Sequence, residues 1–218
     1  MFLPHFTFRK DVYHIMISYL IFSATIIYLV IFTIKKYCLN KTNKASEEFW
    51  NREREANATR RVDPDTIEYL KIPIETLPFQ ENPDDELREI QETIQNLAKE
   101  RLLNLTGFTN TDIKLKYGAA NLPMISQCDQ RFTLLARALY KWAVYLFEHE
   151  EVQKAQIVLE YAVSCKTDIT GIYTMLADIY LSQDRTEDVA ELILSVEQLP
   201  TLMKDSIAQK LKNKLAFR

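Results

Sequence analysis

The sequence predicts an all-α protein in which a membrane-spanning helix is followed by an extended arm and a helical domain. Three observations indicate this class. Only 3 of the 218 residues are glycine, whereas sheets, hairpins and phosphate-binding loops use more of it. Residues 12–34 contain no charged side chain. From residue 87 onward, apolar residues recur at the three- and four-residue spacing of amphipathic helices.

The charge and the cysteine content exclude several classes of protein. The formal net charge is −3 and the pI is about 5.7, so the basic surface of a nucleic-acid-binding protein is not expected. The cysteines and histidines do not cluster, so neither a disulfide framework nor a metal site is expected. These scattered residues are Cys38, Cys128, Cys165, His5, His14 and His149. Free thiols fit a reducing compartment.

Residues 1–11 form a short N-terminal tail, and Val12 to Ile34 is the predicted transmembrane helix. As a helix, this segment would rise about 34 Å, enough to cross a hydrocarbon core of about 30 Å. A cleaved signal peptide is the alternative. Its apolar core would be shorter and would end at small residues, whereas Lys35 and Lys36 follow this run directly. The pattern therefore favours a permanent single-pass anchor.

Flanking cations predict the orientation of this helix. Arg9 and Lys10 precede it, whereas Lys35, Lys36, Lys41 and Lys44 follow it. The positive-inside rule then places the C-terminal domain in the cytoplasm, at the cell membrane.

Two segments connect the anchor to the domain. Residues 35–61 form a polar juxtamembrane stalk that is expected to begin as a helix. Residues 62–86 form a proline-rich, acidic arm, which its prolines prevent from forming one continuous helix. A charged spacer would explain the acidic residues but not the apolar stretch from Tyr69 to Phe79. We therefore expect an extended arm that packs against another part of the protein.

Residues 87–135 are predicted to form N-terminal capping helices. The first begins after the acidic run Asp84 to Glu86 and continues to about Leu105. A short helix follows from Thr111 to Tyr117 and ends at Gly118. We expect residues 118–126, which include Pro123, to form a loop.

Beyond residue 135 the sequence repeats with a period of 34 residues. Seven positions of one segment correspond to seven positions of the next, and the size classes agree at nearly every one of them. These pairs are Leu139 with Tyr173, Trp142 with Leu176, Ala143 with Ala177, Leu146 with Tyr180, Ala155 with Val189, Leu159 with Ile193, and Ala162 with Val196.

This pattern resembles the tetratricopeptide repeat, of which residues 136–203 would hold two TPR-like copies. The resemblance implies an α-α superhelix of antiparallel helix pairs, with residues 204–218 as a C-terminal capping helix. Thr167 and Val189 depart from the family pattern, which has a proline and a small residue there. The layout of anchor, arm and repeats is also similar to that of uncharacterised membrane proteins of clostridia-like bacteria.

The resemblance implies a concave groove that holds an extended peptide or a helix. The residues that would line it are Arg137, Tyr140, Val144, Phe147, Thr174, Asp178 and Leu181. Alternatively, these side chains pack against the preceding helices or the arm. Residues 69–79 could themselves lie in the groove, either permanently or as a displaceable mask.

Catalytic motifs are not found. GxGxxG, GxxxxGK[ST], HExxH and GxSxG do not occur, and the carboxylate pairs are adjacent in sequence, as on solvated helix faces. No enzyme activity, cofactor or metal is therefore expected. The sequence favours a membrane-anchored adaptor or scaffold that binds a protein partner. A structural subunit of a cell-envelope or secretion assembly is the first alternative, and an enzyme with an unrecognised site is the second.

Overall fold

The computed structural model describes residues 7–216, and within this range the chain is helical without β-strands. The all-α prediction is confirmed for these residues. The chain divides into two units, Met1–Glu55 and Ala56–Arg218. The second unit, called the helical domain below, contains one antiparallel β-bridge in its described part, between Leu70 and Leu102.

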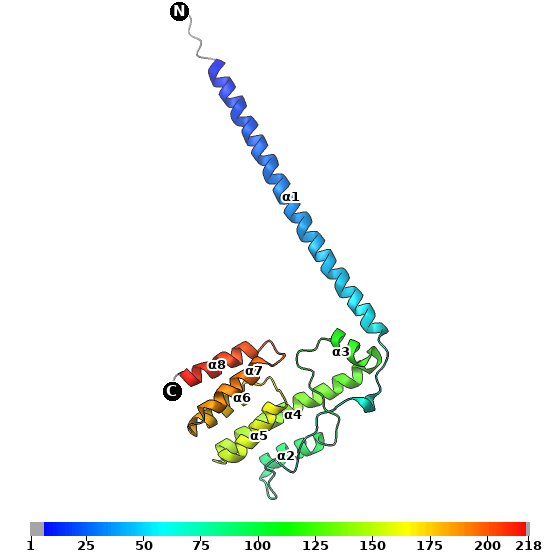
Figure 1. Ribbon diagram of the computed structural model, residues 1–218, viewed down its shortest axis with the longest axis vertical. Helices are drawn as coiled ribbons and strands as arrows, with labels where there is room; N and C mark the ends of the chain where they lie inside the picture. The colour runs from blue at the N-terminus through cyan, green and yellow to red at the C-terminus, as the bar shows by residue number, and fades with distance from the viewer. Residues whose placement is uncertain (1–6, 217–218) are drawn as a thin grey trace, which may run out of the picture. The chain divides into compact units, whose positions relative to one another are not determined.

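Helix α1 spans Thr7–Ala58 without interruption (Figure 1). The predicted membrane segment and most of the predicted stalk therefore form one helix. Residues 7–11, predicted as part of the tail, are helical, and residues 1–6 lie outside the described range. In the described part of the chain, one helix, Met16–Ala58, is long and apolar enough to cross a membrane.

The arm packs against the domain, as the sequence predicts. It contains one 3-10 turn, η1 (Pro64–Thr66), and is otherwise irregular up to α2 (Asp85–Leu97). Ile72 and Leu77 are buried. The ring of Phe79 lies 4.8 Å from the ring of Trp142. Burial of these apolar side chains stabilises the arm on the domain, so the arm is not a solvated spacer.

Asp84 begins α2 and also connects it to α4. Its carboxylate accepts hydrogen bonds from the Leu87 backbone N–H (2.8 Å) and from the Tyr145 hydroxyl (2.7 Å). Both bonds favour the charged form and lower the pKa of Asp84. The first turn of α2 therefore has the acidic cap that the sequence predicts.

The prediction that this helix continues to Leu105 is wrong, because α2 ends at Leu97. The chain then turns, and the Leu70 backbone N–H donates to the carbonyl of Leu102 (2.9 Å). A helix would place Leu103 about 100° away from Leu102 and about 160° away from Leu105, whereas the irregular chain buries all three.

Helix α3 (Asn110–Tyr117) ends at Gly118, as predicted, and Gly118 has a φ of 85°. The predicted loop over residues 118–126 is wrong. A short 3-10 turn, η2 (Ala119–Asn121), leads directly into α4 (Leu122–Glu148). Pro123 lies in the first turn of α4, where a missing N–H costs no helical hydrogen bond. Helix α4 also crosses the predicted boundary between residues 135 and 136 without a break.

The 34-residue period is visible in the backbone. The remaining helices are α5 (Val152–Ser164), α6 (Thr170–Ser182), α7 (Thr186–Glu197) and α8 (Lys204–Ala216). Helices α5 and α7 begin 34 residues apart, each after a turn with one left-handed residue, Glu150 (φ 63°) or Asp184 (φ 61°). The fourteen residues that the repeat pattern pairs are all buried.

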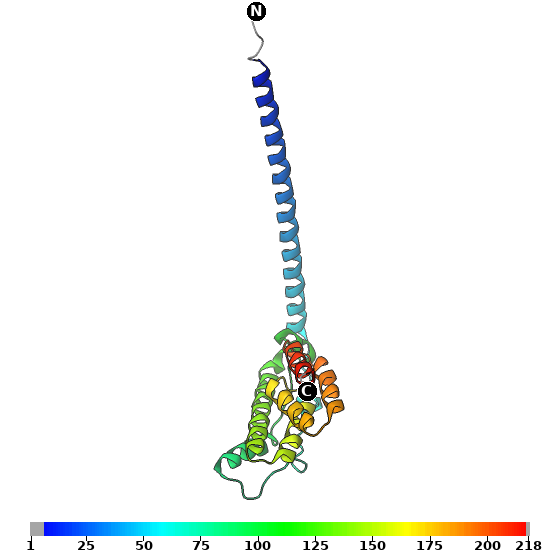
Figure 2. The same cartoon turned by 90° about the vertical axis from the view of Figure 1, so that its left-hand side faces the viewer.

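Helices α4 to α8 pack as successive neighbours, and α2 packs on α4. Figures 1 and 2 show α2 and α8 at opposite ends of this stack. Ile207 and Leu211 of α8 are buried, so α8 covers one end, as expected for residues 204–218. Residues 217 and 218 of that range lie outside the described part.

Candidate functional site

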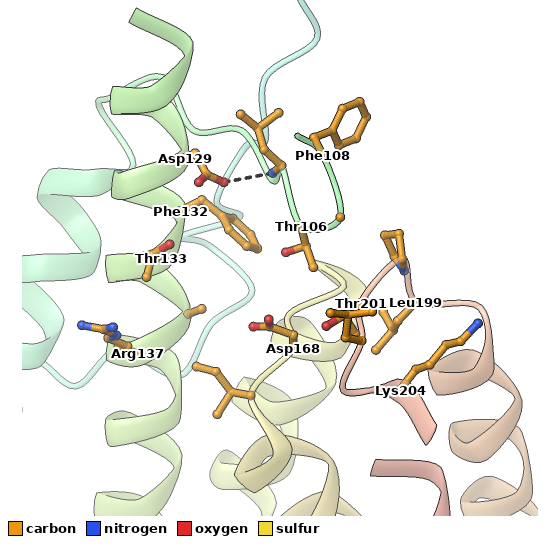
Figure 3. A pocket seen from close by; sticks show the side chains of 16 residues that line it. Thr106, Phe108, Asp129, Phe132, Thr133, Arg137, Asp168, Leu199, Thr201 and Lys204 are labelled. Carbon is orange, nitrogen blue, oxygen red and sulfur yellow. Dashed lines mark hydrogen bonds between the residues drawn. The ribbon is translucent and has the colours of Figure 1, made fainter. Parts of the chain in front are cut away.

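A cleft of about 920 Å³ opens between α4 and three loops of the helical domain (Figure 3). One loop is residues 105–108, the second precedes α6, and the third joins α7 to α8. The lining residues are Leu105, Thr106, Gly107, Phe108, Asp129, Phe132, Thr133, Ala136, Arg137, Asp168, Ile169, Leu199, Pro200, Thr201, Leu202 and Lys204.

The floor of the cleft is apolar. Leu105, Phe132, Ala136 and Leu199 line it and are nearly inaccessible to solvent. Two apolar side chains of the lining are instead exposed, Phe108 (39%) and Leu202 (101%). The cleft thus combines an apolar floor with two exposed apolar side chains in its lining.

Specific contacts hold the loops in place. The Leu105 backbone N–H donates to the Asp129 carboxylate of α4 (3.0 Å). Gly107 has a φ of 85°, and a Cβ atom there would lie 2.1 Å from the carbonyl oxygen of Pro200. Only glycine therefore lets these two loops approach so closely. Because the walls are fixed by internal contacts, the cleft is formed before any ligand binds.

One of the seven predicted groove residues, Arg137, lines this cleft. Several others make internal contacts. The ring of Tyr140 lies against Gly171 of α6. Asp178 forms an ion pair with Lys214 of α8 (2.6 Å). The Thr174 hydroxyl donates to carbonyls of its own helix.

The remaining predicted residues differ in exposure. Leu181 packs partly buried against the core, and Val144 is half-buried. Phe147 is exposed (44%). The structure thus does not gather the seven side chains into one site. Helix α8 is the reason on the α6 side, because its Lys214 pairs with Asp178.

Residues 69–79 contact the Trp142 face of α4. Phe79 packs on Trp142, and the Tyr161 hydroxyl donates to the carbonyl of Lys71 (3.3 Å). Trp142 and Val144 are two residues apart, so their side chains point about 200° apart around α4. The arm therefore packs against the face of α4 that carries Trp142. These contacts do not cover the face that carries Val144.

Sequence reasoning missed most of the cleft because three separate loops bring its residues together. Two signals were present. Gly107 is one of only three glycines, which indicates a special backbone conformation. Leu202 and Met203 form an apolar pair between helices, where polar residues are usual.

The described residues contain no cluster of three or more His, Cys, Asp or Glu side chains that could hold a metal ion. Cys128 and Cys165 are buried, and burial raises the pKa of both thiols. Raised pKa values keep these thiols protonated, and a protonated thiol is a poor nucleophile. Neither cysteine is therefore a candidate catalytic group.

The fold and the cleft define a general class: a helical chain with one helix able to span a membrane and a domain of stacked helices that carries a preformed cleft. Comparisons with protein-family models, curated proteins and solved structures find no match. The function is therefore argued from the residues of the site.

Proposed function

We propose that this chain is a membrane-anchored protein-interaction module whose TPR-like helical domain binds a segment of a partner protein in the cleft. The observation that carries the proposal is the buried apolar floor beside the exposed side chains of Phe108 and Leu202. Burying such side chains against a partner removes apolar surface from water. The TPR-like assignment is supported by the 34-residue recurrence of helix starts and turns.

The polar side chains of α1 support its place in the membrane. Ser23, Thr25 and Thr33 each donate their hydroxyl to a carbonyl three residues earlier in the same helix. In a hydrocarbon layer every polar group needs such a partner, because no water is present to supply one. Attachment to the membrane would raise the local concentration of the domain near membrane partners.

Chemical labelling of Cys38 tests the anchor and its orientation. Cys38 follows the apolar segment and is exposed, whereas the other two cysteines are buried. With the domain in the cytoplasm, a membrane-impermeant maleimide should label Cys38 only after the cells are permeabilised. The matched control, Lys10→Cys combined with Cys38→Ser, should be labelled in intact cells. Labelling of Cys38 in intact cells would reverse the proposed orientation.

Site-specific photo-crosslinking tests binding in the cleft. Thr133 lines the cleft and is exposed, and Gln127 is an exposed residue of the same helix outside the lining. In native membranes, p-benzoylphenylalanine at position 133 of the full-length protein should form an adduct with a partner protein. The same group at position 127 should not. Equal adducts at both positions, or none at 133, would contradict the proposal.

A structural subunit of an assembly is the second candidate, and Phe49 and Trp50 favour it. They pack edge to face at 5.2 Å and are exposed (54% and 56%). Trp50 lies 16 residues beyond Ile34, or about 24 Å along a helix, so a helix normal to the membrane would hold it beyond the lipid headgroups. If α1 makes the main contact with a partner, the photo-crosslinker should react at position 50 and not at 133.

A further inference from the structure

Asp168 is a carboxylate without a hydrogen bond to another residue in the described part of the chain, although its charge is also favourable near the N-terminus of α6. It lies just before α6, lines the cleft and is exposed. Figure 3 shows its side chain directed into the space between α4 and the loops, where the Phe132 ring and the Thr106 hydroxyl also point. Within residues 7–216 it makes no ion pair, whereas Asp178 and Asp188 each pair with a cation.

The other charged groups of the lining do not neutralise Asp168. Arg137 and Lys204 extend outward on opposite sides of the cleft (Figure 3). Asp129 is occupied by the Leu105 backbone N–H. The interior of the cleft therefore presents two carboxylates above an apolar floor, and of these Asp168 is the one without a hydrogen bond within residues 7–216, although the formal charges of the whole lining cancel.

This arrangement favours a particular ligand. An acidic segment would meet Asp168 inside the cleft and be repelled, and a purely apolar segment would bury the carboxylate without a partner, which is costly. A lysine or arginine side chain would instead pair with the carboxylate, and its neighbours could cover Phe132, Phe108 and Leu202. Complementary charge of this kind selects partners and sets their register.

We infer that the cleft binds a segment of a partner protein in which a lysine or arginine is flanked by apolar residues, with the cation paired to Asp168. This inference rests on the proposed function, because it names the chemistry of the partner for the same cleft. Cations of the partner that lie farther out would face Arg137 and Lys204, so a single central cation fits better than a basic run.

Peptide selection on the full-length protein tests the inference. The protein in nanodiscs of zwitterionic lipid is the bait for a phage-displayed library of random heptapeptides. The Thr133→Trp protein, whose cleft is filled, serves for counter-selection. We expect enriched peptides to share one lysine or arginine with apolar neighbours. A synthetic peptide of this sequence should bind Asp168→Asn about tenfold more weakly, as expected for loss of a hydrogen-bonded charge.

Charge reversal gives the sharper comparison. Selection on Asp168→Lys should replace the basic position by aspartate or glutamate, whereas the control Asp205→Lys, at an exposed residue of α8 outside the cleft lining, should keep the basic position. Two results would overturn the inference and leave the proposed function standing. In the first, the enriched peptides need an open cleft but have no basic position. In the second, they bind equally well whatever residue stands at position 168. Absence of any peptide that distinguishes the wild type from Thr133→Trp would overturn both.

Discussion

Replacing Trp142 with alanine should lower the free energy of unfolding of the helical domain by about 4 kcal/mol, as for other large aromatic residues in cores. Trp142 is completely buried in α4. Its ring packs against Phe79 of the arm at 4.8 Å. The substitution would therefore leave a cavity between the arm and the stacked helices and loosen both.

Urea unfolding of the full-length protein in detergent, followed by circular dichroism, measures this change. Phe147→Ala is the matched control, because Phe147 lies on the same helix but is 44% exposed. It should change the free energy of unfolding by no more than about 0.5 kcal/mol. Equal effects of the two substitutions would show that Trp142 is not a core residue.

A second substitution separates packing from hydrogen bonding at this position. The indole N–H of Trp142 is buried and has no hydrogen-bond acceptor. Trp142→Phe removes part of the ring volume but also removes this unsatisfied donor, whose burial is unfavourable. The expected loss is therefore only about 1 kcal/mol, well below that of Trp142→Ala.

The core could be predicted from the sequence because its signal is periodic. Apolar residues recur at helical spacing, and the positions that the pattern pairs, such as Ala143 and Ala177, are buried. The end of α2 has only a partial signal in the sequence. Arg101, four residues after Leu97, interrupts the apolar stripe and Leu103 lies off it, whereas Leu105, five turns after Leu87, would return to it.

The cleft could not be predicted in the same way. Thr106, Asp168 and Thr201 belong to three loops, and no periodic rule relates their positions. Specific hydrogen bonds between distant parts of the chain bring these loops together. For example, the Asn104 side chain donates to the carbonyls of Cys165 and Lys166. Such contacts become visible only when the chain is folded, because they join residues about sixty positions apart.

Replacing Gly118 with alanine should destabilise the helical domain by about 3 kcal/mol, for two reasons. Its φ of 85° and ψ of 142° belong to a region that is essentially restricted to glycine. A Cβ atom there would also lie 2.7 Å from both the carbonyl oxygen of Arg60 and the Cα of Arg61. Both contacts are with backbone atoms, which cannot move aside as a flexible side chain can.

The damage should be local as well as global, because Gly118 lies where the chain from α1 enters the domain. There the Val62 backbone N–H donates to the carbonyl of Tyr117 (3.1 Å), and the buried Asn121 side chain donates to the carbonyl of Val62 (2.7 Å). A side chain at position 118 would push residues 60–62 away and break these bonds. Hydrogen exchange of the Val62 amide should therefore speed up more than exchange in α6 or α7.

Ala120→Gly provides the control, since Ala120 is exposed in the adjacent turn and its change affects mainly the entropy of the unfolded chain, by about 1 kcal/mol or less. If Gly118→Ala left both stability and Val62 exchange at the level of this control, the close approach of Gly118 to Arg60 and Arg61 would be wrong. The position of residues 60–62 would then depend on the hydrogen bonds of Val62 with Tyr117 and Asn121. Asn121→Ala would in that case accelerate Val62 exchange where Gly118→Ala does not.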